Sequence, residues 1–484
     1  MEKLLKYIKY LSTDYIAKIE EMPGQKPPAF SFLILMKYSI NRFLFTLVFV
    51  VTTLLSTVNG QVIPDTIFNK LLRTENGGWV AGDATYSVFL PDGRTLWLFG
   101  DSFIGTVNPD SSLAPGAKMI RNCAVLQEGD SMTAMYQGSF EDPDDFVLTN
   151  TPDSTWFWPE HGIVEEDTLR FIFSEFGHGD GEPGWNFEYR DAYLVNFTYP
   201  ELEFIDIVLL PYYPLNGVMY GDRLMNYDGY TYIYGRKEHN PETHVPYAHL
   251  ARTPIGELTG EWEFYNGSDW SDDAASSAWI SFQAVSQQYG VFPHAGKFVL
   301  ITQQIWLGGK IYSLTANSPE GPWGNFTELY TTPYPFEDMF TYNAYPHPQF
   351  DEDNALLISY NSNGDFWEIF NNVELYRPRF IRIPYTMIDT SFTPLAVMPA
   401  VEQNVRIAKC FPNPASDQLT ISFSIKEDDI VQLKIYNLFG SEVFVSPGKW
   451  FPSGENNIEI SLANLPNGIY IYRINGLSGK FVLN

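Results

Sequence analysis

Short runs of alternating apolar and polar residues, separated by turns rich in Asp, Asn and Gly, fill most of this chain. Residues 162–173, for example, pass from Gly-Ile-Val through the turn Glu-Glu-Asp to Thr-Leu-Arg-Phe-Ile-Phe. Alternation with a period of two is typical of β-strands. Long helical patterns are few, and Gly, Pro and aromatic residues are abundant. The pattern therefore predicts an all-β body.

A strand, a turn and a second, more apolar strand occur together five times, at intervals of about 60 residues. The five units cover residues 81–100, 162–173, 221–235, 288–301 and 345–360. This spacing is expected of four-stranded propeller blades, so we predict a five-bladed β-propeller over residues 61–400. Residues 66–74 or 377–384 should close the ring by completing a shared blade. A two-sheet sandwich is the alternative, although it needs shorter and more even spacing.

The segment 411–484 differs from the repeats. Its alternating runs, such as Leu-Thr-Ile-Ser-Phe at 419–423, predict a small antiparallel sandwich. Three motifs follow in order: Phe-Pro-Asn-Pro-Ala at 411–415, Leu-Lys-Ile-Tyr-Asn-Leu-Phe-Gly at 433–440 and Leu-Pro-Asn-Gly-Ile-Tyr at 465–470. Their order resembles the C-terminal sorting domain of the type IX secretion system, with residues 401–410 as the linker. The resemblance implies that this machinery is a partner and carries the protein across the outer membrane.

The other end agrees with export. A short basic segment at 36–42 precedes the apolar run 43–51 and small residues up to Gly60. This pattern predicts a signal peptide at 36–60, because the apolar run is too short to span a membrane comfortably. Residues 1–35 are then either a long leader or the result of a misassigned start, with Met36 as the initiator. We expect a secreted or outer-membrane surface-anchored protein.

The net charge restricts the classes of binding partner, and the cysteine content restricts the possible disulfide bonds. The net charge of −28 argues against nucleic acid and anionic lipid. The surplus carboxylates suit extracellular Ca²⁺ binding, although solubility alone explains them. Cys123 and Cys410 cannot form a disulfide framework, so two free thiols or a buried Cys123 are expected. We predict a monomer that requires no cofactor.

Carboxylates occur where several predicted inner strands begin. Asp83, Glu160 and Asp222 hold such positions in three different units. Inner strands of a propeller begin near its axis, so these side chains should share one funnel. Crowding of carboxylates raises one pKa while another group stays ionised, which is the arrangement that glycosidic cleavage needs. The chain has no phosphate-binding loop, no zinc-spaced His pair and no Gly-x-Ser-x-Gly elbow.

Motifs in the first and last units resemble a known group of propellers. Ala-Gly-Asp-Ala-Thr-Tyr-Ser at 81–87, Leu-Trp-Leu-Phe-Gly-Asp-Ser-Phe-Ile-Gly at 96–105, Arg-Asn at 121–122 and Ala-Tyr-Pro-His-Pro at 344–348 carry the resemblance. They resemble domain-of-unknown-function families 4185 and 5005 over residues 71–384. The resemblance implies a five-bladed propeller related to glycoside hydrolases that act on furanosides, with arabinanases among the 4185-type members.

In the broader furanosidase group, a first-blade Asp is the base or nucleophile, a second Asp tunes its pKa, and a Glu from a later blade is the acid. Asp83, Asp222 and Glu160 match these roles here, although Glu160 lies in the second blade, where that group has an Asp. The predicted substrate contacts are Asp101, Arg121, Trp158, His161 and Tyr345. Purely structural roles are the alternative: Asp83 could bond backbone amides, and Glu160 with His161 could form a local ion pair.

His347, between two prolines, resembles the central-channel histidine that holds Ca²⁺ in some propeller glycosidases. A packed, hydrogen-bonded histidine is the alternative.

These observations predict a secreted glycan-active protein, a glycoside hydrolase of arabinanase or furanosidase type that acts on a polysaccharide or oligosaccharide. The alternative is a non-catalytic carbohydrate-binding or adhesive propeller. Hydrolysis requires two carboxyl groups within about 10 Å of each other that face solvent. A binding protein would instead present aromatic rings and amides.

Overall fold

The structure is a computed structural model that describes residues 61–392 and 405–484. Within these ranges it leaves out residues 75, 153, 181–185, 241–242, 334–338, 426–428, 438–441, 447–448, 464 and 475–476. The predicted leader, the predicted signal peptide and residues 401–404 of the predicted linker lie outside the described residues. No helix in the described part of the chain has the length and apolar character needed to cross a bilayer.

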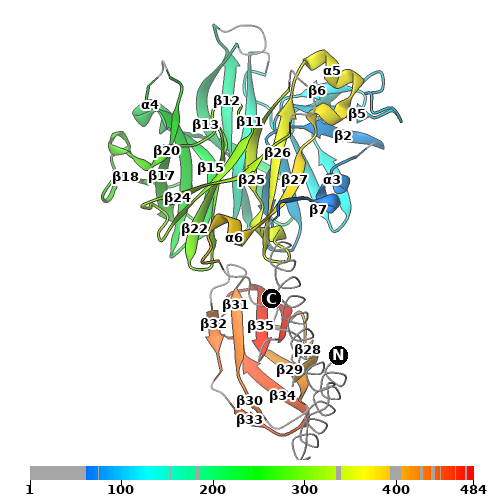
Figure 1. Ribbon diagram of the computed structural model, residues 1–484, viewed down its shortest axis with the longest axis vertical. Helices are drawn as coiled ribbons and strands as arrows, with labels where there is room; N and C mark the ends of the chain where they lie inside the picture. Colours follow the sequence, from blue (N-terminus) through cyan, green and yellow to red (C-terminus); the bar gives the residue numbers. More distant parts are fainter. Residues whose placement is uncertain are drawn as a thin grey trace, which may run out of the picture. The chain divides into compact units, whose positions relative to one another are not determined.

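Five antiparallel sheets, each built on a run of four neighbouring strands, make up the body of the protein (Figure 1). Blade I contains β3 (Tyr86–Phe89), β4 (Thr95–Phe99), β7 (Cys123–Glu128) and β8 (Ser131–Met135). Blade II contains β11 (Thr155–Glu165), β12 (Thr168–His178), β13 (Phe187–Thr198) and β14 (Phe204–Leu210). Blade III contains β15 (Met219–Tyr227), β16 (Tyr230–Glu238), β17 (Pro246–Pro254) and β18 (Glu263–Tyr265), extended by β19 (Trp270–Ser271) and β20 (Trp279–Ala284).

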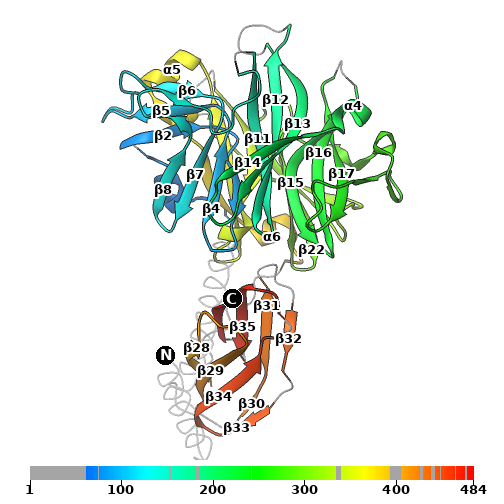
Figure 2. The same cartoon turned by 180° about the vertical axis from the view of Figure 1, so that it is seen from behind.

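Blades IV and V complete the ring. Blade IV contains β21 (Gly290–His294), β22 (Lys297–Gln303), β23 (Lys310–Ala316) and β24 (Gly324–Thr331). Blade V contains β25 (Phe340–Pro346), β26 (Ala355–Asn363), β27 (Arg379–Pro384) and, from the other end of the propeller, β1 (Ile63–Pro64). Blue blade I and yellow blade V lie side by side in both views (Figures 1 and 2). The predicted five-bladed propeller is confirmed.

The ring closes through a strand from the start of the described chain. Ile63 pairs with Arg382 and Pro64 with Ile381, so β1 becomes the outer strand of blade V. The segment 377–384 thus takes part in closure, as predicted, through β27. Most of the predicted segment 66–74 is instead helix α3 (Thr66–Leu71). Asp65 joins the two features, because it caps α3 at the Phe68 amide (2.7 Å) and pairs with Arg382 (2.7 Å) in a buried site.

Neighbouring blades are held together by alternating residues of their second strands. In β12, Phe171 and Phe173 pack toward blade I, whereas Ile172 packs toward blade III. In β26, Ile358 packs toward blade IV and Leu357 toward blade I. Successive side chains of a strand point to opposite faces, and here both faces are buried. This explains why the second run of each repeat is the more apolar.

Three inner strands lose their register for two residues. The unpaired residues are Glu160–His161 in β11, Gly221–Asp222 in β15 and Asn343–Ala344 in β25. Such irregularities re-aim side chains that would otherwise alternate. Gly221 is required at its position, because a Cβ there would lie 2.7 Å from the Cβ of Glu160 and its φ is +130°.

Smaller elements surround the blades. A three-stranded sheet contains β2 (Asn76–Gly82), β5 (Ser102–Thr106) and β6 (Lys118–Ile120), and β9 (Gln137–Gly138) pairs with β10 (Pro143–Asp144). The helices are α4 (Tyr213–Asn216), α5 (Phe366–Asn371) and α6 (Tyr385–Ile388), with 3₁₀ turns η1 (Ala274–Ser276), η2 (Pro348–Phe350) and η3 (Val373–Tyr376). Helix α5 lies beside the three-stranded sheet in both views, and Phe103 contacts the rings of Phe370 and Tyr376 (Figures 1 and 2).

The C-terminal part forms a separate β-sandwich. One sheet contains β28 (Val405–Phe411), β29 (Gln418–Ile425) and β34 (Gly454–Ser461). The other contains β31 (Leu433–Asn437), β32 (Glu442–Val445), β35 (Gly468–Ile474) and β36 (Leu477–Leu483), and β30 (Asp429–Val431) pairs with β33 (Lys449–Phe451). Alternate residues of β29, such as Ile421 and Phe423, are buried in the core. Strand β28 begins inside the segment predicted as linker, so Cys410 lies in a strand.

Candidate active site

Asp83 lies between β2 and β3, at the approach to the inner strand of blade I. Its backbone N–H donates to the carbonyl of Asp101 (3.3 Å), and the N–H of Gly100 donates to the carbonyl of Asp83 (3.1 Å). These bonds bring two acidic residues from either side of β4 together. The side chain of Asp83 is half-buried, and the Tyr342 hydroxyl donates to its Oδ2 atom at 2.7 Å.

Gly100 makes the approach of these segments possible. A Cβ atom at this position would lie 2.6 Å from Oδ1 of Asp83, a distance that real Cβ atoms essentially never show. Any larger residue would therefore push Asp83 out of its place. This explains why the residue before Asp101 is a glycine.

Asp101 is held by two side chains from other segments. Trp158 Nε1 of blade II donates to its Oδ1 atom at 2.9 Å, and Arg121 Nη1 lies 3.1 Å from Oδ2. The guanidinium of Arg121 also lies 4.7 Å from the ring centre of Trp156. The side chains of Asp101 and Arg121 are 20% and 36% exposed, so this ion pair contacts solvent.

The two acids have different electrostatic surroundings. Burial, together with the nearby charge of Asp101, raises the pKa of Asp83 to about 7, against the opposing hydrogen bonds from Tyr342 and Tyr376. Burial also raises the pKa of Asp101, but the charge of Arg121 and the bond from Trp158 oppose this. The charge of Asp101 adds to the rise at Asp83, whereas Arg121 opposes the rise at Asp101, so Asp83 is the member of the pair that keeps its proton to higher pH.

Trp158, which binds Asp101, packs among other aromatic rings of blade II. Trp158 contacts the rings of Phe176 (4.5 Å between centroids) and Phe187 (5.0 Å). Phe187 is 37% exposed and Trp158 is half-buried. Exposed ring faces of this kind stack well on sugar rings.

Asp222 and Glu160 form a second, buried cluster around Arg236. Arg236 Nη1 donates to Oδ1 of Asp222 (2.8 Å), and Nη2 donates to Oε1 of Glu160 (3.3 Å). The side chain of Asp222 has no exposed surface, and that of Glu160 is 5% exposed. Tyr86 and Ser174 donate to the oxygens of Glu160 at 2.7 and 2.9 Å.

The burial of this cluster determines its charge. Burial raises the pKa of Asp222 well above its usual range, although the charge of Arg236 opposes the shift. Its Oδ2 atom has no hydrogen-bond partner among the described residues. Arg236 keeps its charge because the two carboxylates offset its own burial. In this conformation Asp222 cannot contact a substrate.

Sequence reasoning missed Arg236, Tyr342 and Tyr376. A signal for Arg236 is present in the sequence, because one charged residue ends the run Tyr-Thr-Tyr-Ile-Tyr-Gly-Arg at 230–236. Both tyrosines reach Asp83 from blade V, Tyr342 from β25 and Tyr376 from η3 between β26 and β27. Nothing in the local sequence around Tyr342 or Tyr376 marks these contacts.

The predicted substrate residues divide between the two clusters. Asp101, Arg121 and Trp158 lie together beside Asp83. Tyr345 instead donates to the backbone carbonyl of Asp222 (3.0 Å) and is buried. His161 is also buried, 3.0 Å from Arg223 Nη1, and burial lowers its pKa well below the usual range.

His347 is buried between two serine hydroxyls. Its Nδ1 atom lies 2.6 Å from Oγ of Ser87, and its Nε2 atom lies 2.8 Å from Oγ of Ser359. These contacts suit the packed, hydrogen-bonded alternative. In the described ranges, no group of three or more His, Cys, Asp or Glu side chains is arranged to hold a metal ion. A Ca²⁺ role for His347 stays a prediction.

The fold and the sorting sandwich define an exported five-bladed propeller. Residues 65–393 match the family described as "Domain of unknown function (DUF5005)", and residues 409–483 match the "Secretion system C-terminal sorting domain". The chain belongs to the DUF5005 family, as the resemblance in its first blade predicted. Its sorting domain directs it to type IX export, so the protein is secreted or attached to the cell surface.

Solved structures include similar folds. A protein from Bacteroides ovatus ATCC 8483, described as a "putative hydrolase", has 20% identity and a TM-score of 0.57, over 66% of this chain and 90% of its own. A GH43_1 enzyme from Xanthomonas citri, in complex with xylotriose, has 12% identity and a TM-score of 0.36, over 67% and 90%. A family 43 arabinoxylan arabinofuranohydrolase from Bacillus subtilis has 12% identity and a TM-score of 0.38, over 83% and 94%.

The Bacteroides likeness shows a shared fold, and the other two are too distant to support an argument about chemistry. The comparison with curated proteins gave no match.

Proposed function

We propose that this protein is a secreted glycoside hydrolase in which Asp83 and Asp101 form the acid and base pair. One observation carries the proposal: two half-buried carboxylic acids lie side by side, with the pKa of Asp83 raised to about 7 and Asp101 bound to Arg121. Glycosidic cleavage needs one protonated and one ionised carboxyl group. Asp83 takes the role of acid here, whereas the resemblance to furanosidases implied the role of base or nucleophile.

The reaction follows from these protonation states. Asp83 gives its proton to the glycosidic oxygen as the bond to the anomeric carbon breaks. Asp101 either removes a proton from the attacking water or attacks the anomeric carbon itself, depending on the separation of the two carboxyl groups. Water supplies the new hydroxyl in both cases. When Asp101 is the nucleophile, Asp83 takes a proton from the water that cleaves the glycosyl–Asp101 ester and is restored directly. When Asp101 is the base, it holds the water's proton and releases it to solvent, and Asp83 takes up a new proton from solvent. Trp158 and Arg121 keep Asp101 in place and ionised.

Asp222 and Glu160 become positioning residues in this proposal. Their shared bonds to Arg236 fix the inner strands of blades II and III, next to Trp158 of β11. The predicted substrate is a furanoside polysaccharide of the arabinan type. The half-exposed rings of Trp158 and Phe187 support a sugar ligand.

The test is hydrolysis of a polysaccharide panel by the purified protein, with released reducing ends as the measurement. Asp83→Asn and Asp101→Asn should each lower kcat about 10²–10⁴-fold, the usual contribution of acid–base catalysis. Asp228→Asn, at an exposed turn where Asn tolerates the positive φ, is the control. Equal cleavage by the Asp83 variant contradicts the proposal. Binding without cleavage by the unmodified protein favours the non-catalytic alternative.

A further inference from the structure

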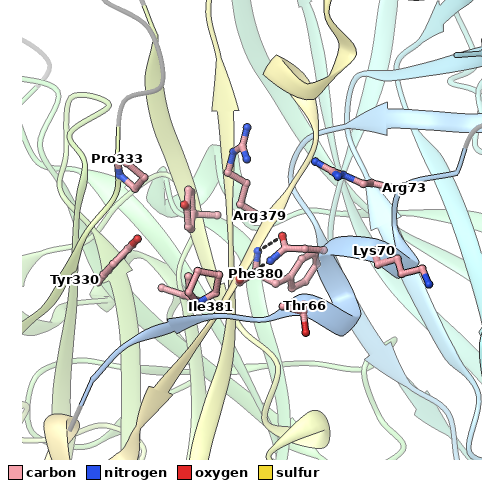
Figure 3. Close-up of a pocket in the computed structure, with 11 residues that line it drawn as sticks. Thr66, Lys70, Arg73, Tyr330, Pro333, Arg379, Phe380 and Ile381 are labelled. Carbon is pink, nitrogen blue, oxygen red and sulfur yellow. Dashed lines mark hydrogen bonds between the residues drawn. The ribbon is translucent and has the colours of Figure 1, made fainter. Parts of the chain in front are cut away.

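A cavity of about 430 Å³ opens on the outer strands where blades IV and V meet. Its walls come from β1, α3, β24, β26 and β27, and none of its lining residues belongs to the candidate active site. Figure 3 shows Tyr330 and Pro333 on one side, Arg73 and Lys70 on the other, and Arg379 between them. Phe380 and Ile381, which follow Arg379 on β27, lie below it in this view (Figure 3).

The lining carries positive charge. Lys70, Arg73 and Arg379 line the cavity, and no carboxylate is among its lining residues in the described part of the chain. Glu374, just outside, pairs with Arg73 but also binds Arg377 at 2.7 Å. In the described ranges neither Lys70 nor Arg379 has a carboxylate within ion-pair distance. Glu374 is therefore the one carboxylate paired with these three cations in the described ranges, and it also neutralises Arg377. The net charge of the whole chain is −28, so this positive site stands out.

The floor of the cavity is rigid and largely apolar. The side chain of Asn69 accepts from the N–H of Phe380 (2.9 Å) and donates to its carbonyl (2.8 Å), which fixes α3 on β27. Arg379 is held by a bond from Nη2 to the carbonyl of Glu374 (3.0 Å). The rings of Tyr330 and Tyr360 lie 6.4 Å apart. The site is therefore formed before any ligand arrives.

We propose that this cavity is a second glycan-binding site, specific for a sugar that carries a carboxylate or a sulfate group. Arginine and lysine bind such anions through charge-assisted hydrogen bonds, and tyrosine rings and the apolar floor accept the face of a sugar ring. An acidic polysaccharide is repelled by most of this acidic surface, and a local group of cations reverses that repulsion. The sugar part of this inference rests on the proposed function, whereas the anion part rests on the charges alone.

The experiment measures binding to the full chain by calorimetry at 50 mM NaCl. The probes are a galacturonate trisaccharide, a sulfated galactose trisaccharide and neutral arabinotriose. At least one anionic probe should bind, and Arg379→Gln should weaken it by about tenfold or more, as expected for a lost charge-assisted bond. Raising NaCl to 500 mM should weaken it further.

Matched variants guard against misfolding. Lys70→Gln with Arg73→Gln changes two exposed side chains and should weaken binding as Arg379→Gln does. Lys118→Gln with Lys310→Gln makes the same change of charge at exposed residues outside the cavity, and it should leave binding unchanged. Thermal unfolding confirms that each variant is folded.

The outcomes identify which anionic group binds, and they distinguish a failure of this inference from a failure of the proposed function. Binding of galacturonate alone identifies a carboxylate ligand, and binding of the sulfated sugar alone identifies a sulfate ligand. The inference is overturned if neither anionic probe binds, or if the cavity variants bind the anionic probes as the unmodified protein does. Arabinotriose is a ligand of the active site in our proposal, so the cavity variants should bind it as the unmodified protein does. Binding of the anionic probes is measured separately from hydrolysis. If these probes do not bind but the protein still cleaves its polysaccharide, the proposed function stands and the second site is refuted. If the probes bind but no polysaccharide is cleaved, the second site stands and the proposed function is refuted.

Discussion

The hydroxyl of Tyr342 donates a 2.7 Å hydrogen bond to Oδ2 of Asp83 across 259 positions of the chain. Tyr342 belongs to β25, the inner strand of the last blade, and Asp83 precedes the inner strand of the first. The bond therefore spans the joint at which the propeller closes. It also stabilises the ionised form of Asp83, so closure of the ring and the acidity of this residue are connected.

Removing this hydroxyl should raise the pKa of Asp83 above about 7. A hydrogen bond to a charged group contributes about 1.5–3 kcal/mol, and one pKa unit corresponds to about 1.4 kcal/mol. Because Asp83 acts as the protonated acid in our proposal, Tyr342→Phe should move the alkaline limb of the kcat–pH profile up by about one unit. The measurement is hydrolysis between pH 5 and 9.

Tyr312→Phe, on β23 in the outer part of blade IV, is the control for that profile. Its alkaline limb should coincide with that of the unmodified protein. If the alkaline limb of the kcat–pH profile of Tyr342→Phe stays in place or moves to lower pH, Asp83 is not the catalytic acid.

The raised pKa of Asp83 also predicts how stability depends on pH. Its folded pKa of about 7 exceeds the usual value of 3.8, so the folded state holds a proton that the unfolded state releases between these values. Stability from this group is therefore complete below about pH 4 and is lost as the pH rises toward 7. Asp83→Asn should remove this loss, so its Tm should exceed that of the unmodified protein by at least about 2 °C at pH 8 but not at pH 4.

Differential scanning fluorimetry across this range checks the difference. The comparison with Asp83→Asn removes the contribution of distant buried acids such as Asp351, which titrate equally in both proteins. A Tm difference that does not change with pH would contradict the raised pKa.

The buried cluster predicts a large stability effect at Arg236. Arg236→Gln leaves Asp222 and Glu160 without their shared cation in a site that excludes water. Breaking a buried ion pair on one side costs about 3–5 kcal/mol. Unfolding in urea measures the loss. Lys310→Gln, which breaks an exposed pair with Glu328, should barely change the midpoint, and similar midpoints for the two variants would refute a stabilising role for the cluster.

Ring closure depends on Asp65. Asp65→Ala removes the cap of α3 and leaves Arg382 without its buried partner, at a cost of about 1 kcal/mol for the cap and about 3–5 kcal/mol for the pair. Urea unfolding of the purified protein should show both losses together. Asp273→Ala, which removes only the cap of η1, should cost about 1 kcal/mol. Equal costs for the two variants would mean that the Arg382 pair contributes nothing.

Local pattern was sufficient to predict the architecture. Period-two alternation, Asp- and Gly-rich turns and a recurring strand–turn–strand unit specify strands, hairpins and blades, because each depends on residues that are close in the chain. The sorting domain was predictable for the same reason. Only the closing strand was misplaced, since β1 is two residues long and carries no periodic signal.

The chemistry of the carboxylates could not be predicted in this way. The motif points to Asp83, but the acidic residue that the structure places beside it is Asp101, whereas Asp222 pairs with Arg236. The placement of Asp101 beside Asp83 depends on contacts from Trp158, Arg121 and Tyr342, which lie in different parts of the propeller. Two unpaired residues in β15 place Asp222 against Arg236, inside the protein. The exposure and the pKa of a side chain depend on its neighbours in space. Here those neighbours come from blades that are far apart in the chain and meet only when the propeller packs.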